Sequence, residues 1–222
     1  MAKVDSVNLG RPKPNPHKEI GWTGISKQPT DEPVEVRAPG SRITGLGSGL
    51  VEDFIGDRKH HGGDDQAVYA FQREDLDAWE RRLGRELPNG FFGENLTTIG
   101  LDVNDARIGE RWRVGEEVVL QVTAPRIPCS TFRGWMGKKG WAKIFTAAGR
   151  PGAYLKVIAP GAIRAGNSIE VIDRPDHDVT VSFLFRATTT ERELLPRLLA
   201  AEAYLDPETI EMARQGKVFL LD

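Results

Sequence analysis

Hydrophobic and polar residues alternate along much of this chain, which is the pattern of half-buried β-strands. The clearest examples are EEVVLQVTAP at residues 116–125 and PVEVR at residues 33–37. Shorter runs rich in apolar and β-branched residues predict further strands at 3–9, 20–27, 67–71, 94–100, 111–115, 153–161, 168–173 and 179–185. Glycine and proline punctuate these runs, with a turn expected at 160–167. The sequence therefore predicts a mainly β, α+β fold.

Helical periodicity is confined to a few segments. Leu76, Trp79 and Leu83 recur at spacings of three and four, which predicts an amphipathic helix over 73–84 that ends at Gly84. Residues 130–149 contain helical fragments interrupted by glycine.

The composition changes near residues 173–178, where DRPDHD has the character of a polar linker. Beyond the strand at 179–185, residues 189–217 favour helix, with Thr189 or Thr190 as the first N-cap and Asp206-Pro207 starting a second helix. We therefore expect a β-rich domain over 1–172, followed over 173–222 by a linker and a helical extension.

Length and charge exclude several classes of protein. The chain of 222 residues is long enough to bury a large core without disulfides, and it has a single cysteine. Its 30 basic and 32 acidic residues give a net charge of -2, so no strong overall field would attract nucleic acid or anionic lipid. No apolar run is long enough to suggest a membrane span. We expect a soluble, cytoplasmic protein that binds neither nucleic acid nor membrane.

The single cysteine, Cys129, lies in the stiff stretch TAPRIPCS. Pro125 and Pro128 each fix one φ angle and extend the preceding residue, so the thiol leaves the backbone in a defined direction. A helix starting near Ser130 and the nearby Arg126 would both favour the thiolate, which binds metals and attacks electrophiles. The alternative is a buried thiol that acts as a small hydrophobic side chain.

Two further segments carry candidate chemistry. In GDRKHHGGDDQ, residues 56–66, Gly62 and Gly63 allow close backbone approach and the basic residues offer donors to an anion, although a charged surface turn is the alternative. In FFGENLTTIG, residues 91–100, Glu94 is a candidate for proton transfer and Asn95 for hydrogen bonding to a heterocycle, although both are also ordinary turn caps.

Four segments together resemble the MOSC domain, the module found at the C-termini of molybdenum-cofactor sulfurases, and most closely its YiiM-type branch. They are HHGGDDQAVYAF, FGENLTTIGL, VLQVTAPRIPC and IRAGNSIEVI, in matching order and spacing over nearly the whole chain. The resemblance implies a β-barrel-like core with a small C-terminal extension of three helices.

The resemblance also implies a molybdenum cofactor, molybdopterin, whose metal is bound by Cys129. Proteins of this kind reduce N-hydroxylated compounds such as hydroxylaminopurines and amidoximes, which is a detoxification activity. Cofactor-binding candidates at matching motif positions are Lys27, His61, Gly62, Gly63, Asn95, Arg126 and Arg164. One position departs from the family pattern: Gln66 stands where a lysine is common, which removes a positive charge near an anionic phosphate.

On this reading the protein is a molybdenum-dependent oxidoreductase, with His61 or Glu94 helping to deliver protons. The chain shows neither a cysteine cluster for iron and sulfur nor a dinucleotide-binding fingerprint, so no haem, iron–sulfur cluster or flavin is expected in it. Electrons would then come from a separate donor protein, and the chain itself is a possible homodimer. One alternative is a non-catalytic module that binds the cofactor or carries a persulfide sulfur on Cys129. The other is a structural barrel with an inert thiol.

Overall fold

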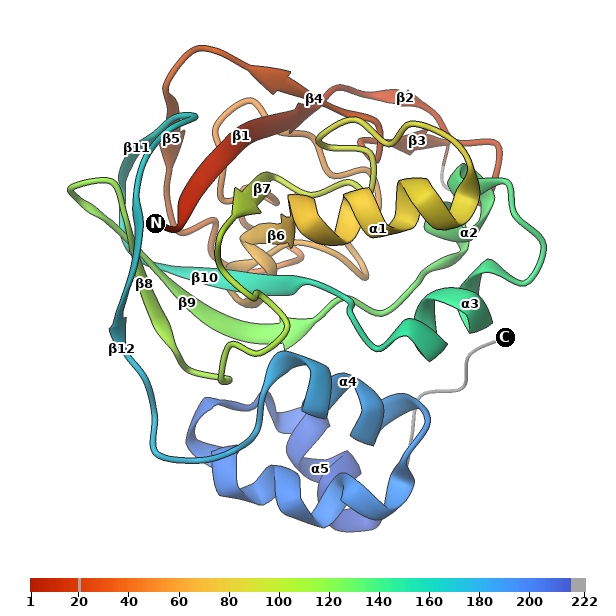
Figure 1. Cartoon of the computed structure of the whole chain (residues 1–222), viewed down its shortest axis with the longest axis vertical. Coiled ribbons are helices and arrows are strands. Elements are labelled where there is room, and N and C mark those ends of the chain that lie inside the picture. The colour runs from red at the N-terminus through yellow and green to blue at the C-terminus, as the bar shows by residue number, and fades with distance from the viewer. Residues whose placement is uncertain (20, 217–222) are drawn as a thin grey trace.

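The computed structural model describes residues 1–19 and 21–216 and is organised around one sheet of eight strands (Figure 1). Their order across the sheet is β12-β8-β9-β10-β6-β7-β1-β4. The strands are β1 (Lys3–Gly10), β4 (Lys27–Thr30), β6 (Val68–Gln72), β7 (Leu96–Ile99), β8 (Arg111–Val114), β9 (Val118–Pro125), β10 (Ala153–Ala159) and β12 (Ile169–Asp173). All pairs are antiparallel except β6 with β7. The mixed α+β class is confirmed.

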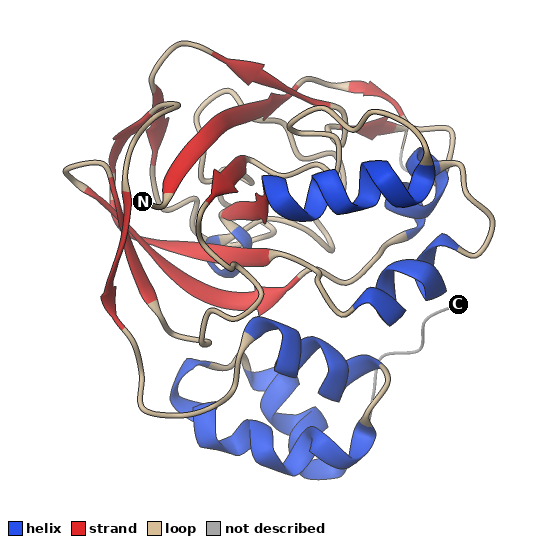
Figure 2. Cartoon of the chain, in the orientation of Figure 1, coloured by secondary structure: helices blue, strands red, loops and turns tan. Residues whose placement is uncertain are grey.

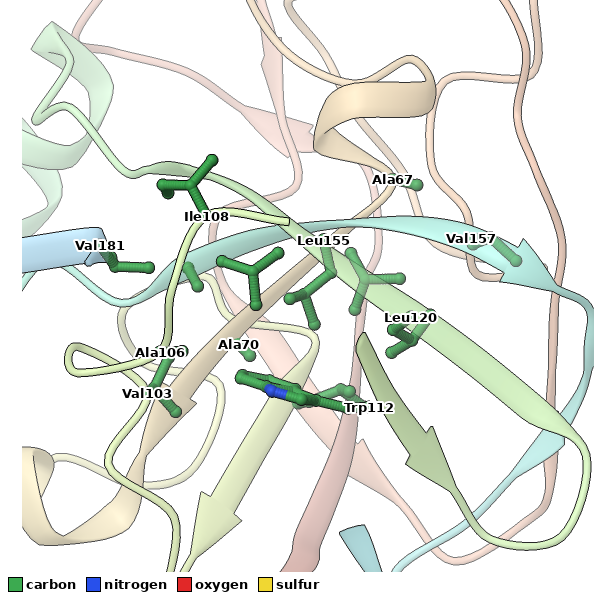
Figure 3. Close-up of a cluster of buried hydrophobic side chains, with 14 of the residues drawn as sticks. Ala67, Ala70, Val103, Ala106, Ile108, Trp112, Leu120, Leu155, Val157 and Val181 are labelled. Atoms are coloured by element: carbon green, nitrogen blue, oxygen red, sulfur yellow. The ribbon is translucent and has the colours of Figure 1, made fainter. Parts of the chain in front are cut away.

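The alternation in the sequence corresponds to one buried face of this sheet. On β9, Val118, Leu120 and Val122 are buried while the residues between them are partly exposed. These side chains belong to the main hydrophobic cluster, in which Figure 3 shows Leu120 together with Trp112 of β8 and Leu155 of β10. Burial of this face is the principal stabilising contribution to the body of the protein.

The described strands form no closed barrel, because the sheet order ends in β12 and β4. The chain just before β12 does approach β1: Lys3 pairs with Ser168, and the Val4 N–H donates to the Asn167 carbonyl at 2.9 Å. The sheet is thus strongly curved, and the closure expected of a barrel is not found.

Two small sheets differ in part from the sequence prediction. The strands β2 (Lys13–Pro14) and β3 (Trp22–Thr23) form one hairpin, and β5 (Val34–Val36) pairs with β11 (Gly161–Ile163). The strand predicted over 20–27 is therefore reduced to β3 and the first residue of β4, with residue 20 outside the described part. The turn predicted at 160–167 contains β11, because Ile163 is buried opposite Val34.

Helices lie outside the sheet (Figure 2). They include α1 (Arg73–Leu83), α2 (Ser130–Met136), α3 (Trp141–Ala148) and the short 3₁₀ helix η1 (Asp64–Gln66). The helix α1 ends at Gly84, which adopts φ 64°, so the predicted C-terminus is confirmed. An aromatic cluster that includes Trp79, Phe92 and Trp141 joins α1 to α3.

Three helical elements follow the last strand: α4 (Val181–Thr189), η2 (Arg192–Tyr204) and α5 (Pro207–Gln215). The strand predicted at 179–185 was wrong, because residues 181–185 belong to α4. Thr180 caps the start of this helix, and its side chain accepts from Phe183 N–H at 3.1 Å. Neither Thr189 nor Thr190 is the first N-cap. The start at Asp206-Pro207 is confirmed, with Asp206 capping α5. Among the described residues, no helix combines the length and apolar character needed to cross a membrane.

Candidate active site

Cys129 lies in the link between β9 and α2, as the N-cap of α2, and lines a cavity of about 110 Å³. The residue is extended, with φ -87° and ψ 169°, which continues the direction set by the preceding prolines. It is partly exposed rather than enclosed in the core. The expected placement of the thiol at a cavity is therefore seen.

Six of the candidate site residues meet in the lining of this cavity, although they come from four separate segments of the chain. They are Lys27, His61, Gly62, Asn95, Arg126 and Cys129. Residues that lie far apart in the sequence are thus brought to one cavity by the order of strands β6, β7, β9 and β10.

The electrostatic environment of Cys129 favours the thiolate. Burial by itself would raise the pKa of the thiol. The hydrogen bond and charge of His61 and the positive charge of Arg126 outweigh burial, and the pKa falls from 9.0 to about 6. The site therefore holds an ionised sulfur near neutral pH, which is the form that binds metals.

Arg126 supplies a fixed positive charge to the cavity. The side chain is 6 % exposed, its Nη1 donates to the Phe92 carbonyl, and its guanidinium lies 3.8 Å from the ring centroid of Phe132 and 5.1 Å from that of Tyr69. No carboxylate forms an ion pair with Arg126 in the part of the chain that the structure describes. Its charge therefore remains available to an anion.

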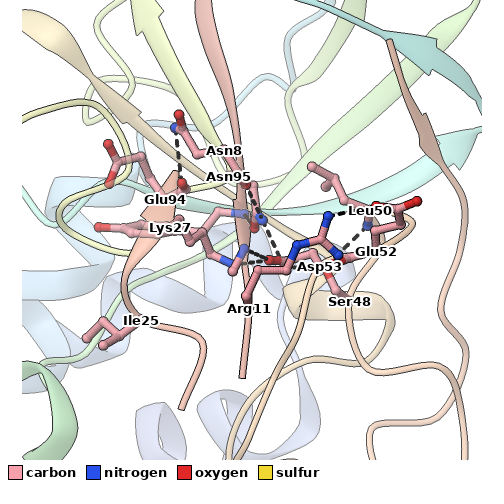
Figure 4. A network of polar contacts seen from close by, with 12 residues as sticks. Asn8, Arg11, Ile25, Lys27, Ser48, Leu50, Glu52, Asp53, Glu94 and Asn95 are labelled. Carbon is pink, nitrogen blue, oxygen red and sulfur yellow. Dashed lines mark hydrogen bonds and ion pairs between the residues drawn. The ribbon is translucent and has the colours of Figure 1, made fainter. Parts of the chain in front are cut away.

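Lys27, by contrast, is already paired. Its ammonium binds the carboxylate of Asp53, and both side chains are almost fully buried (Figure 4). The same carboxylate accepts from Gly10 N–H at 2.7 Å, Ser48 Oγ at 2.7 Å and Asn95 Nδ2 at 3.0 Å. This network joins β1, β4 and the turn before β7, and it holds Lys27 and Asn95 at the cavity wall.

Glu94 does not line the cavity. It is fully buried, and its Oε1 accepts from Gly90 N–H at 2.6 Å and from Thr97 Oγ1 at 3.0 Å. Burial raises the pKa of this carboxyl to about 6. The geometry makes Glu94 a support of the turn that carries Asn95, and not a direct proton donor to a ligand in the cavity.

The two glycines of the HHGG motif have different surroundings. Gly62 lines the cavity with φ 83°, and a Cβ there would lie 2.6 Å from the Gly47 carbonyl oxygen. Gly63 does not line it, and its N–H donates to that same carbonyl at 2.9 Å. Gly62 therefore allows close packing against residue 47 and Gly63 against Arg42, and the Gly63 N–H is not free for an anion.

Arg164 also lies away from the cavity. It belongs to the turn between β11 and β12, where its N–H donates to Asn167 Oδ1 at 2.8 Å. Gln66 does line the cavity, and its buried Oε1 has no hydrogen-bond partner. The position that departs from the family pattern thus presents a neutral acceptor at the cavity.

Sequence reasoning missed several lining residues, which are Trp22, Asp53, Asp57, Tyr69 and Tyr154. Asp57 binds Lys18 and His60 through Oδ2 and leaves its buried Oδ1 unpartnered. Tyr69 and Tyr154 come from adjacent strands, with ring centroids 5.2 Å apart. Their strands were predicted correctly, but only the pairing of β6 with β10 shows that the two rings share one wall.

Comparison with known protein families finds one domain model that spans most of the candidate site. The MOSC domain model matches residues 57–170, a range that contains His61, Asn95, Arg126 and Cys129. The chain belongs to the MOSC domain family. This MOSC protein is 33% identical over 189 residues to the uncharacterized protein YflK of Bacillus subtilis, a match that covers 82% of this chain and 79% of YflK.

Two further matches extend the comparison. A protein of Gibberella moniliformis named a reductase is 28% identical over 160 residues, which span 69% of this chain but only 26% of that protein. The crystal structure of YiiM from Geobacillus stearothermophilus superposes with a TM-score of 0.77 at 26% identity, covering 97% of this chain and 99% of YiiM. The likeness to YiiM therefore includes the C-terminal helices as well as the sheet.

Proposed function

We propose that this MOSC protein binds a molybdenum cofactor through Cys129 and reduces N-hydroxylated compounds such as hydroxylaminopurines and amidoximes. The observation that carries the proposal is the position of the thiol, which lines a cavity beside His61 and Arg126 instead of facing a dry hydrocarbon interior. Membership of the MOSC family and the similarity to a protein named a reductase support a redox role.

The residues of the cavity suit such a cofactor. Among the described residues, no group of three or more histidine, cysteine or acidic side chains is arranged to hold a metal ion. A single thiolate donor suits a metal that brings its other ligands with it, as an organic cofactor allows. Arg126 offers a charge to an anionic group, and the unpartnered Gln66 Oε1 offers an acceptor to N–H groups.

In the proposed mechanism the cofactor would supply the two-electron redox chemistry. Cys129 would hold the metal at its sulfur, with the direction of the Cα–Cβ bond set by the extended backbone. His61, which lines the cavity and lowers the pKa of that thiol, is the side chain that would hold a proton near the reacting hydroxyl. Tyr69 and Tyr154 would exclude water from the inner wall. A separate protein would deliver the electrons.

A sulfur-carrier function is the second candidate, because a thiolate with a pKa of about 6 also suits persulfide formation. Intact mass spectrometry separates the two. A reducible gain of one sulfur atom on Cys129, in protein that lacks molybdenum and reduces no N-hydroxylated compound, would support the carrier.

The direct test is reduction of benzamidoxime with a chemical electron donor. We expect turnover by the wild-type protein, its loss in Cys129→Ser, and a strong decrease in His61→Ala. His60→Ala is the matched control, since this neighbouring side chain is 52% exposed and does not line the cavity. Equal turnover by wild type and Cys129→Ser would contradict the proposed function.

A further inference from the structure

Trp22 is the most exposed of the five tryptophans, all of which the structure describes. It lies on β3 and is 55% exposed. The other four are engaged in packing or hydrogen bonds: Trp79 and Trp141 pack on aromatic rings, Trp112 Nε1 donates to Glu110 and Trp135 Nε1 donates to the Phe91 carbonyl. Within the described residues Trp22 has neither a ring partner nor a side-chain hydrogen bond.

Trp22 nevertheless lines the same cavity as Cys129. The exposed fractions of the lining side chains show which end of the cavity opens to solvent. Tyr69 is 3% exposed and Arg126 6%, so they form the floor, whereas Trp22 lies at the mouth. A cofactor held by Cys129 and Arg126 would occupy the floor. A substrate that approaches it from solvent would pass the Trp22 ring.

The backbone of Trp22 is held in place although its ring is free. The hairpin of β2 and β3 is closed by Asn15, whose N–H donates to the Gly21 carbonyl at 3.0 Å. Asn15 Nδ2 also donates to Thr131 Oγ1 at 3.1 Å, which ties the hairpin to the helix that starts beside Cys129. On the other side, a Cβ at Gly56 would lie 2.0 Å from the Trp22 carbonyl oxygen, so the chain is in close contact there.

We propose that Trp22 is a stacking surface for flat aromatic substrates, which it positions with their N-hydroxyl group toward the Cys129 end of the cavity. This inference rests on the proposed function and adds a substrate preference to it. An indole offers a large π-face, and stacking of one base on an aromatic side chain is a substantial and sequence-tolerant contribution to binding. Aromatic amidoximes and N-hydroxylated purines gain this contact, whereas small aliphatic N-hydroxyl compounds do not.

The first test measures binding without turnover. Adenine is flat and carries no N-hydroxyl group, so it reports stacking whether or not the protein reduces anything. In protein purified from a molybdenum-replete host, we expect adenine to quench tryptophan fluorescence saturably. Trp22→Ala should abolish that quenching and weaken adenine binding, measured by calorimetry, by about 5- to 150-fold. Trp135→Phe is the control, because that ring packs on Phe91 outside the cavity and its loss should leave the quenching intact.

The second test uses the reaction. Trp22→Ala should raise KM for benzamidoxime with little change in kcat, while KM for an aliphatic substrate such as N-hydroxyurea stays at the wild-type value. In cofactor-free protein, an unchanged rate of Cys129 alkylation by iodoacetamide in Trp22→Ala shows that the cavity is still formed. Absent quenching in the wild type, or adenine affinity within about twofold of wild type in Trp22→Ala, would overturn the inference. Failure of N-hydroxyl reduction with adenine binding intact would instead count against the proposed function alone.

Discussion

His61 and Cys129 lie on separate segments of the chain but line the same cavity, where His61 lowers the pKa of the Cys129 thiol. His61 follows the turn that starts at Asp57, whose carbonyl accepts the His61 N–H at 3.0 Å. Cys129 follows β9. The fold thus brings the thiol and an imidazole to one cavity from two segments that are far apart in the sequence.

The lowered pKa of Cys129 predicts how the reactivity of the thiol depends on pH. In cofactor-free protein the rate of Cys129 alkylation by iodoacetamide should rise with pH and reach half its maximum at about pH 6. His61→Ala should move the midpoint upward by about one unit or more, because the hydrogen bond and charge that favour the thiolate are lost. A midpoint near 9, the usual value, in the wild type would show that the thiol is not activated.

The lowered pKa of Cys129 also predicts how the free energy of unfolding depends on pH. Between about pH 6 and 9 the unfolded chain binds a proton at Cys129 that the folded chain does not, so this group makes the free energy of unfolding increase with pH. Cys129→Ser should remove that increase. Chemical unfolding at pH 6 and pH 8.5 measures it, and an identical pH dependence in both proteins would count against the assigned pKa.

The buried ion pair of Lys27 and Asp53 should contribute to the stability of the fold more than to the net charge of the cavity. Asp53→Ala leaves the Lys27 ammonium buried and unpaired, which costs about 3–5 kcal/mol. The Lys27→Met, Asp53→Leu double variant should recover a large part of this loss, since no buried charge remains. Urea unfolding of the three proteins tests this, and a loss below about 1 kcal/mol in Asp53→Ala would mean that the pair is hydrated.

Glu94 should make the free energy of unfolding decrease as pH rises, which is opposite to the effect of Cys129. Its pKa is raised from 4.5 to about 6, so its stabilising effect is full below pH 4.5 and is lost as pH rises through 6. Relative to Glu94→Gln, which stays neutral, the wild type should lose about 2 kcal/mol of unfolding free energy over this range. A difference between the two proteins that does not change with pH would refute the assignment.

How far the sequence predicted the fold depends on whether local pattern and tertiary packing agreed. The helix α1 was predicted with its end, because Leu76, Trp79 and Gly84 carry both periodicity and a terminator. The helix α4 was missed because VTVSFLF is rich in β-branched and aromatic residues. Yet Val181, Leu184, Phe185 and Thr188 are buried at helical spacing, a signal that a longer window would have shown.

In the candidate site, too, the residues marked by a sequence motif were found more readily than those placed only by tertiary contacts. The motifs predicted that Lys27, His61, Asn95, Arg126 and Cys129 would converge, and they do. Other expectations depended on contacts that no motif specifies. Glu94 is turned into the core, and Arg164 lies on another turn. Trp22 fell within a predicted strand, but no motif marks its ring as part of the cavity.

The N-cap of α4 provides a test of the corrected helix. Thr180→Ala removes the acceptor for the Phe183 N–H and should cost about 1 kcal/mol, while Thr180→Ser should keep most of the stability. Thermal unfolding of both variants measures the difference. Equal destabilisation by serine and alanine would point to lost methyl packing instead of a lost cap.

The most direct test of the central claim is the molybdenum content of protein purified from a molybdenum-replete host. The account predicts about one molybdenum per chain in the wild type, a similar content in the His60→Ala control and almost none in Cys129→Ala, with all three equally folded. Equal molybdenum contents in wild type and Cys129→Ala, or none in either, would contradict it.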